Sequence, residues 1–136
     1  MKRLVIFSLL ILTLLTGLIS CKKSTSNSVF PNGTYHGTFQ RLSSGKGDIS
    51  NVTIVFNDNK WVGQSDKQRY PALCEGSFQI SAINEITFSN SCAWTSDFDW
   101  SLILDNEYTV QVVGDKYIMT QNFDNWTKNI YTLTKQ

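Results

Sequence analysis

Hydrophobic and polar residues alternate along much of the chain between residues 33 and 134, which is the period of a strand with one buried face. The clearest case is the stretch from Cys74 to Cys92, which matches itself when it is folded back at Ile83. Its predicted facing pairs are Cys74–Cys92, Gly76–Asn90, Phe78–Phe88 and Ile80–Ile86, with a three-residue loop at 82–84. The other face carries only Glu, Ser, Gln and Thr. The pattern therefore predicts a half-buried antiparallel hairpin.

This pairing brings the thiols of Cys74 and Cys92 within reach of each other, so a cross-strand disulfide is predicted. Closing a loop of this length stabilises a fold by about 3 kcal/mol, mainly through the constraint on the unfolded chain. A disulfide of this kind is typical of an oxidising compartment.

The same alternation predicts strands at 33–39, 51–56, 60–64, 100–104, 108–112, from 117 onward and at 129–134. Their predicted inward residues include Tyr35, Val52, Ile54, Phe56 and Trp61, and the hairpin at 113–116 sets Val112 opposite Tyr117 and Val110 opposite Met119. In 100–104 the apolar residues Trp100, Leu102 and Leu104 meet 108–112 only if 105–107 is a loop. No segment has sustained helical periodicity.

About nine strands follow one another, which predicts an all-β fold: a small antiparallel meander barrel of about eight to ten strands. An odd number would make the first and last strands parallel where the barrel closes. Either a strand near 68–73 is missing from this count, or one strand too many is included.

The meander predicts where the connections lie. Long loops at 41–50, 65–73 and 93–99 fall at the end remote from the start of the barrel, whereas the loop at 122–128, with Phe123 and Trp126, falls at the near end. Long loops on a rigid scaffold are where binding residues concentrate. The candidate ligand-binding residues are Tyr70, Trp94, Phe98 and Trp100, and Arg41, Lys46, Arg69 and Asp97 are expected beside them.

The N-terminus has the form of a secretory signal at 1–20, with Lys2 and Arg3 before an apolar run from Leu4 to Leu15. Residues 18–21, Leu-Ile-Ser-Cys, resemble the lipobox of bacterial lipoproteins, which implies that Cys21 is lipidated. The two remaining cysteines then form an even pair. A free Cys21 in an ordinary secreted protein is the alternative. The polar stretch 21–32 is predicted to be a flexible tether without core residues, followed by one domain at 33–136.

The balance of charges and the set of reactive side chains exclude several classes of function. Twelve Lys and Arg stand against 11 Asp and Glu, which argues against nucleic acid as a partner. The single histidine, His36, is expected to point outward, and two of the three cysteines are expected to be paired, which leaves no activated nucleophile. Asp97, Asp99 and Glu75 could form a glycosidase carboxylate pair or a Ca²⁺ site, but acidic residues in such a loop are more typical of turns. We therefore expect no enzyme activity, cofactor or metal.

The domain from Gly33 to Thr134 resembles the small lipocalin-like β-barrel lipoproteins of Gram-negative bacteria. The resemblance lies in Gly-Thr-Tyr-x-Gly-Thr-Phe at 33–39, in the Cys74–Cys92 hairpin and in the segment from Trp94 to Trp100. It implies a lipid-anchored barrel in the cell envelope, at the outer membrane, facing the periplasm or the surface.

Two functions remain open at this stage. The first is a non-enzymatic barrel that binds a small apolar or amphipathic ligand in a cavity lined by Tyr35, Phe56, Phe78, Phe88 and Leu102. The second is a protein- or glycan-interaction module, an inhibitor or a subunit of an envelope complex, with a solid core and exposed loop aromatics.

Overall fold

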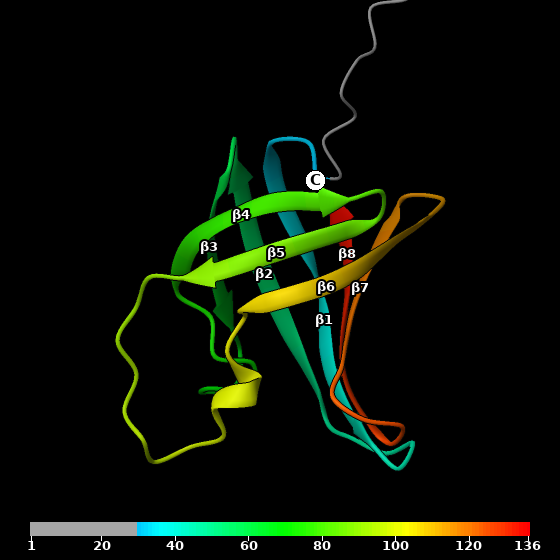
Figure 1. The fold of residues 1–136 in the computed structure, drawn as a ribbon. Helices are drawn as coiled ribbons and strands as arrows, with labels where there is room; N and C mark the ends of the chain where they lie inside the picture. The colour runs from blue at the N-terminus through cyan, green and yellow to red at the C-terminus, as the bar shows by residue number, and fades with distance from the viewer. Residues whose placement is uncertain (1–29) are drawn as a thin grey trace, which may run out of the picture.

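The computed structural model describes residues 30–136, which form a closed barrel of eight antiparallel strands (Figure 1). The strands are β1 (Gly33–Ser43), β2 (Ile49–Asn57), β3 (Lys60–Ser65), β4 (Glu75–Ala82), β5 (Glu85–Asn90), β6 (Asn106–Val113), β7 (Lys116–Asn122) and β8 (Thr127–Lys135). Each strand pairs with the next, and β8 pairs with β1. The predicted all-β meander barrel is confirmed. Within the described range no helix is long and apolar enough to cross a membrane.

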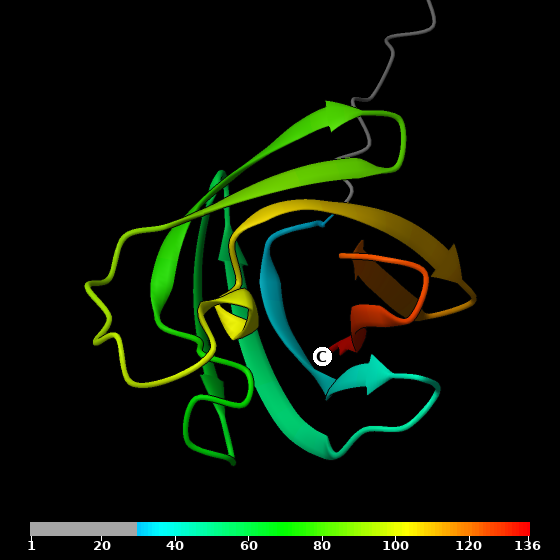
Figure 2. The same cartoon turned by 60° about the horizontal axis from the view of Figure 1, so that its bottom comes forward.

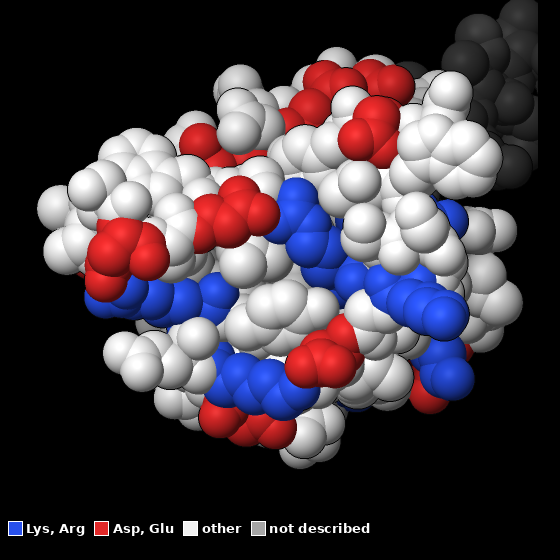
Figure 3. Space-filling view, turned by 90° about the horizontal axis from the view of Figure 1, so that it is seen from below, with Lys and Arg blue, Asp and Glu red and all other residues white. Residues whose placement is uncertain are grey.

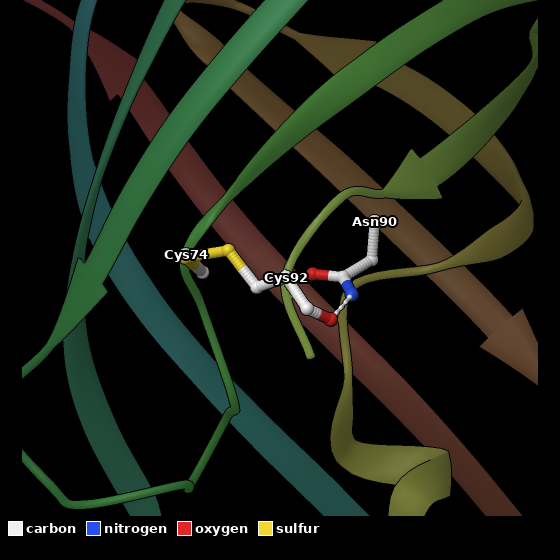
Figure 4. Close-up of a disulfide and its surroundings, with 3 residues drawn as sticks. All are labelled: Cys74, Asn90 and Cys92. Atoms are coloured by element: carbon white, nitrogen blue, oxygen red, sulfur yellow. Dashed lines mark hydrogen bonds between the residues drawn. A yellow bond between two sulfur atoms is a disulfide. The ribbon is translucent and has the colours of Figure 1, made fainter. Parts of the chain in front are cut away.

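The hairpin of β4 and β5 has the predicted register, with Phe78 opposite Phe88 and Ile80 opposite Ile86. The disulfide joins Cys74 and Cys92 just beyond the strand ends, with Cα atoms 6.4 Å apart (Figure 4). Beside it the Asn90 side-chain amide donates a hydrogen bond of 2.7 Å to the Cys92 carbonyl. The predicted disulfide hairpin is therefore confirmed.

The turn of this hairpin differs from the prediction. Ala82 pairs with Glu85, and the register shifts between Ile80 and Ala82, so the turn itself is only 83–84. Asn84 has a φ of 66°, a left-handed conformation that asparagine tolerates better than most residues. Ser81 is thus left without a partner as a bulge in β4, and Ala82, which the sequence pattern placed in a longer loop, belongs to the strand.

The predicted strand at 100–104 is wrong. Residues Trp100–Leu102 form a 3₁₀ helix, η1, whose first turn is capped by the Asp99 carboxylate accepting from the Ser101 N–H. β6 begins at Asn106, so the predicted loop at 105–107 is wrong as well. Only a single bridge, between Ala72 and Ile103, forms where a further strand was considered near 68–73. Without the predicted strand at 100–104, the count falls from nine to eight, which is the even number that a closed antiparallel barrel needs.

Aromatic and aliphatic side chains fill the barrel. The largest of the fully buried side chains are Phe30, Tyr35, Phe39, Ile54, Phe56, Trp61, Ile86, Phe88, Leu104, Tyr108, Met119 and Tyr131. Val52, Ile54 and Phe56 face inward from β2 as predicted, and Val112 and Val110 lie opposite Tyr117 and Met119. The alternation therefore identified most of the core.

Phe30 corrects the predicted boundary between the tether and the domain. Its side chain is 1% exposed and stacks on Phe56 at a ring-centroid distance of 4.5 Å, with Tyr35 and Tyr117 also in contact. The prediction that 21–32 carries no core residue is therefore wrong at Phe30. The signal at 1–20 and the lipidation site at Cys21 lie outside the described residues.

Candidate functional site

The barrel has two unlike ends. We call the end where Phe30 and the start of β1 lie the proximal end and the other the distal end (Figure 1). The proximal turns are the short ones at 58–59, 83–84 and 114–115. The distal connections are 44–48, 66–74, 91–105 and 123–126, which Figure 2 brings toward the viewer. The loop at 122–128 was predicted at the near end, and it moves to the distal end because the chain has one strand fewer.

Arg41 attaches the long 91–105 connection to the barrel wall. Its guanidinium lies 2.5 Å from Asp99 Oδ2 and donates to the Ser101 hydroxyl at 2.6 Å, and its side chain is only 16% exposed. The Asn129 amide of β8 donates to the Ser101 carbonyl at 2.8 Å. Hydrogen bonds from Ser101, together with the charge of Arg41, hold the pKa of Asp99 below its usual range. η1 is thus fixed against β1 and β8.

Trp94 and Phe98 pack on each other within this connection, with ring centroids 5.6 Å apart. The Arg69 guanidinium lies 5.1 Å from the Phe98 ring and donates to Asp97 at 2.7 Å. Hydrogen bonds from Thr95 and then Arg69 lower the pKa of Asp97. Because both rings are half-buried, Trp94 and Phe98 order the loop and offer only part of their surface to a partner.

Tyr70 joins two other distal connections. Its hydroxyl donates to the Asp48 carbonyl at 3.0 Å and accepts from the Arg41 N–H at 3.3 Å, and its ring packs edge-on against Phe39. The Lys67 ammonium lies 5.6 Å from the same ring and 3.6 Å from the Asp48 carboxylate. Tyr70 is therefore a half-buried link between loops.

The exposed aromatic side chains of the distal end are Trp100, Phe123 and Trp126. Trp100 is 56% exposed, with its indole N–H donating to the Thr95 carbonyl, whereas the sequence pattern had placed it on the apolar face. Trp126 is 71% exposed. Of the four predicted ligand-binding residues, the structure thus leaves Trp100 most open to solvent. It adds Phe123 and Trp126, which an even strand count would have placed correctly.

Trp126 lies beside an open groove of about 570 Å³ between the 44–48 and 123–126 connections. The groove is lined by Leu42, Ser44, Gly45, Asn122, Asp124, Asn125, Trp126, Thr127 and Lys128. The Asp124 carboxylate accepts 2.6 Å hydrogen bonds from the N–H groups of Trp126 and Thr127, which lowers its pKa. The Ser44 N–H donates to the Trp126 carbonyl at 2.9 Å. The backbone that carries the exposed indole is therefore well fixed.

Charges of both signs lie side by side on the distal face, which Figure 3 views directly. The ion pairs found within residues 30–136 are Arg41–Asp99, Lys67–Asp48 and Arg69–Asp97, and all belong to the distal end. Since Asp97 and Asp99 each pair with a different arginine, they do not form a free carboxylate pair. The face is mixed in charge rather than a basic or acidic patch.

His36 points outward from β1, and the Thr53 hydroxyl lies 3.0 Å from its Nδ1. It lines a shallow groove of about 520 Å³ along β1, β2 and β3, with mostly polar neighbours such as Asn51 and Asp66. Among residues 30–136 no group of three His, Cys, Asp or Glu side chains could hold a metal ion.

The barrel interior, the other candidate site, is occupied by its own side chains. Four of the residues expected to line a cavity, Tyr35, Phe56, Phe78 and Phe88, are buried, with neighbouring ring centroids between 5.3 and 6.3 Å apart. Leu102 packs against the same core. Burial raises the pKa of the Tyr108 and Tyr131 phenols still further above neutral pH, as expected for hydroxyls enclosed in an apolar core.

No family model, curated protein or solved structure matches this chain. The likeness to lipocalin-like lipoproteins rests on the sequence features given above.

Proposed function

We propose that this is a non-enzymatic, lipid-anchored protein of the cell envelope that binds a glycan through its distal loops. One contrast supports this proposal: the barrel interior is filled by aromatic side chains, whereas Trp126 stands exposed beside a distal groove. A ligand inside the barrel would have to displace buried rings such as Phe56 and Phe88.

The chemistry of the groove favours a sugar. One face of a pyranose ring carries C–H groups, which stack well on the electron-rich face of an indole such as Trp126. Sugar hydroxyls both donate and accept hydrogen bonds, and the groove offers the amides of Asn122 and Asn125, the hydroxyl of Thr127 and the ammonium of Lys128. The side chains of Asn122 and Asn125 are exposed. They are therefore available to a ligand.

A peptide ligand fits less well. Peptides commonly add a strand to an open sheet edge or insert apolar side chains into a hydrophobic groove. The barrel is closed, so its sheet has no unpaired edge strand, and most of the residues that line the groove are polar, with Leu42 as the one aliphatic residue among them.

The anchor follows from the sequence. The lipobox-like residues 18–21 and the pairing of the two other cysteines support lipidation at Cys21. The chain reaches Phe30 at the proximal end of the barrel, so an anchor at Cys21 leaves the distal loops facing away from the membrane.

Binding can be measured with a soluble chain that carries Cys21→Ser. We would titrate it with chitotriose, soluble peptidoglycan fragments and lipopolysaccharide core oligosaccharide, using tryptophan fluorescence and ligand-observed NMR. We expect one of these probes to bind, and Trp126→Ala to weaken it roughly tenfold or more, as removal of an aromatic anchor does.

Trp100→Ala is the matched control, because it removes another exposed distal tryptophan that lies outside the groove. It should leave binding unchanged. Equal losses in both variants, or no binding to any of the probes, would contradict the proposal.

A further inference from the structure

Four exposed aliphatic side chains lie at the tips of two hairpins at the proximal end of the barrel. They are Ile80 and Ile83 at the tip of the β4–β5 hairpin and Val112 and Val113 at the tip of the β6–β7 hairpin, and we call them the proximal tip patch. Ile83, at the turn, is 92% exposed. Isolated exposed aliphatic residues are common on proteins, but a group of four at one end calls for a partner.

The two hairpins are neighbours in the sheet. β5 pairs with β6, and the Val110 N–H donates to the Asn84 carbonyl at 2.7 Å, so the two tips lie next to each other. Figure 1 shows both tips at the end of the barrel where β1 begins. Three residues of the patch are therefore set on strands of a closed sheet, and Ile83 lies in the two-residue turn between two of those strands.

The position of the patch identifies its partner. Cys21 precedes the buried Phe30 by nine positions, and a fully extended chain of that length spans about 30 Å at most. An acylated Cys21 would therefore keep the proximal end close to the bilayer. The exposed aromatic side chains, which are typical of binding surfaces, lie by contrast at the distal end: Trp100, Phe123 and Trp126.

We infer that the proximal tip patch inserts into the boundary between headgroups and acyl chains of the membrane that holds the anchor. The inference rests on the lipid anchor of the proposed function. Ile and Val gain from leaving water, and the charged residues flanking the two turns are Glu85, Asp115 and Lys116, which form no basic cluster, so the contact does not require anionic lipids. Its effect is to hold the barrel upright, with the distal loops turned away from the bilayer.

Site-specific fluorescence tests the contact directly. The full lipidated chain carrying Ile83→Cys is labelled with an environment-sensitive NBD dye and reconstituted in phosphatidylcholine vesicles. We expect a blue-shifted emission that lipids with a shallow doxyl quencher reduce. Lys46→Cys, exposed on the distal connection 44–48, is the matched control and should emit as in water.

The outcomes separate the two proposals. A label at position 83 that stays aqueous, on protein that floats with the vesicles, would overturn the contact and leave the anchor intact. A blue shift that depends on protein concentration and persists without vesicles would assign the patch to a second copy of the chain, and would also overturn it. Absence of an acyl group on Cys21 by mass spectrometry would remove the anchor and the contact together.

A second measurement tests the orientation. Energy transfer from a donor at position 46 to an acceptor dye in the headgroup layer should be low when the barrel stands upright. The double variant Ile83→Ser, Val113→Ser should let the barrel tilt and so raise the energy transfer. The conservative variant Ile83→Leu should leave the energy transfer unchanged. Equal transfer in all three proteins would show that the patch does not orient the barrel.

Discussion

The two ends of the barrel are held together in different ways. At the proximal end the turns are short, and the contacts of Phe30 with Phe56 and Tyr117 close the core. At the distal end the long connections bury Ala72, Ile103 and Leu104, and ion pairs, hydrogen bonds and a disulfide add to this burial. Apolar burial with short turns therefore closes the proximal end, whereas polar and covalent links supplement apolar burial at the distal end.

The sharpest test of this difference compares two phenylalanines. Phe30→Ala removes a buried ring from the proximal core and should lower the free energy of unfolding by about 3–5 kcal/mol. Urea denaturation followed by fluorescence would measure the change. Phe123→Ala removes an exposed ring at the distal end and should change stability by less than about 1 kcal/mol. Similar losses in both variants would abolish the distinction between the ends.

Reduction of the Cys74–Cys92 disulfide should have the next largest effect. The bridge links the 66–74 and 91–105 connections, and its loss should lower the free energy of unfolding by about 3 kcal/mol. Hydrogen exchange should then rise mainly in 91–105, with β1 and β8 still protected. Uniform exchange across the barrel would show that the disulfide supports the whole fold rather than the distal end.

A smaller effect is expected from the ion pair of Asp99 with Arg41. The pKa of Asp99 is lowered in the folded protein, so its contribution is present above the ordinary value of about 3.9 and is lost as the pH falls through the lower folded value. Since the carboxylate is exposed, Asp99→Asn should cost only about 1 kcal/mol at pH 7. Asparagine can still cap η1.

The difference between wild type and Asp99→Asn should therefore vanish in strong acid, as measured by urea midpoints across a pH series. Asp97→Asn is the control at the neighbouring pair with Arg69, where the acidic side chain is more exposed, and its effect should be smaller. A difference that grows in acid would mean that the sign of the pKa shift is wrong.

The smallest effects should come from the two proposed contact residues. Trp126→Ala and Ile83→Ser each remove a side chain that is mostly exposed, so each should change stability by less than about 0.5 kcal/mol. Melting temperatures would check this. A larger loss in either variant would show that the side chain serves the fold rather than a partner.

Alternation in the sequence was sufficient to predict the barrel and the register of the disulfide hairpin, because a one-residue shift would have turned Phe78 and Phe88 to the solvent. It failed at Trp100, where three alternating apolar residues imitate a strand. There the local bond from Ser101 to the Asp99 side chain determines the structure instead.

The errors at the two ends have separate causes. Phe30 is a single aromatic residue in a polar stretch, so periodicity carries no signal for it, and only the space between Tyr35, Phe56 and Tyr117 explains its burial. The wrong placement of Trp126 followed from the extra strand, since each strand reverses the direction of the chain. One local error thus placed the loop at 122–128 at the wrong end of the barrel.

The pairing of β1 with β8 has a consequence for the order in which the molecule forms. Tyr35 lies opposite Lys135, so the strands that meet there are separated by nearly the whole chain, whereas the β4–β5 hairpin needs only its own residues. Gly37 makes this meeting very close, because a Cβ there would lie 1.9 Å from the Thr132 carbonyl oxygen. Contacts of such separation slow folding. The barrel can therefore close only when β1 and β8 are both available to pair, whereas the β4–β5 hairpin can form from its own residues and serve as a nucleus.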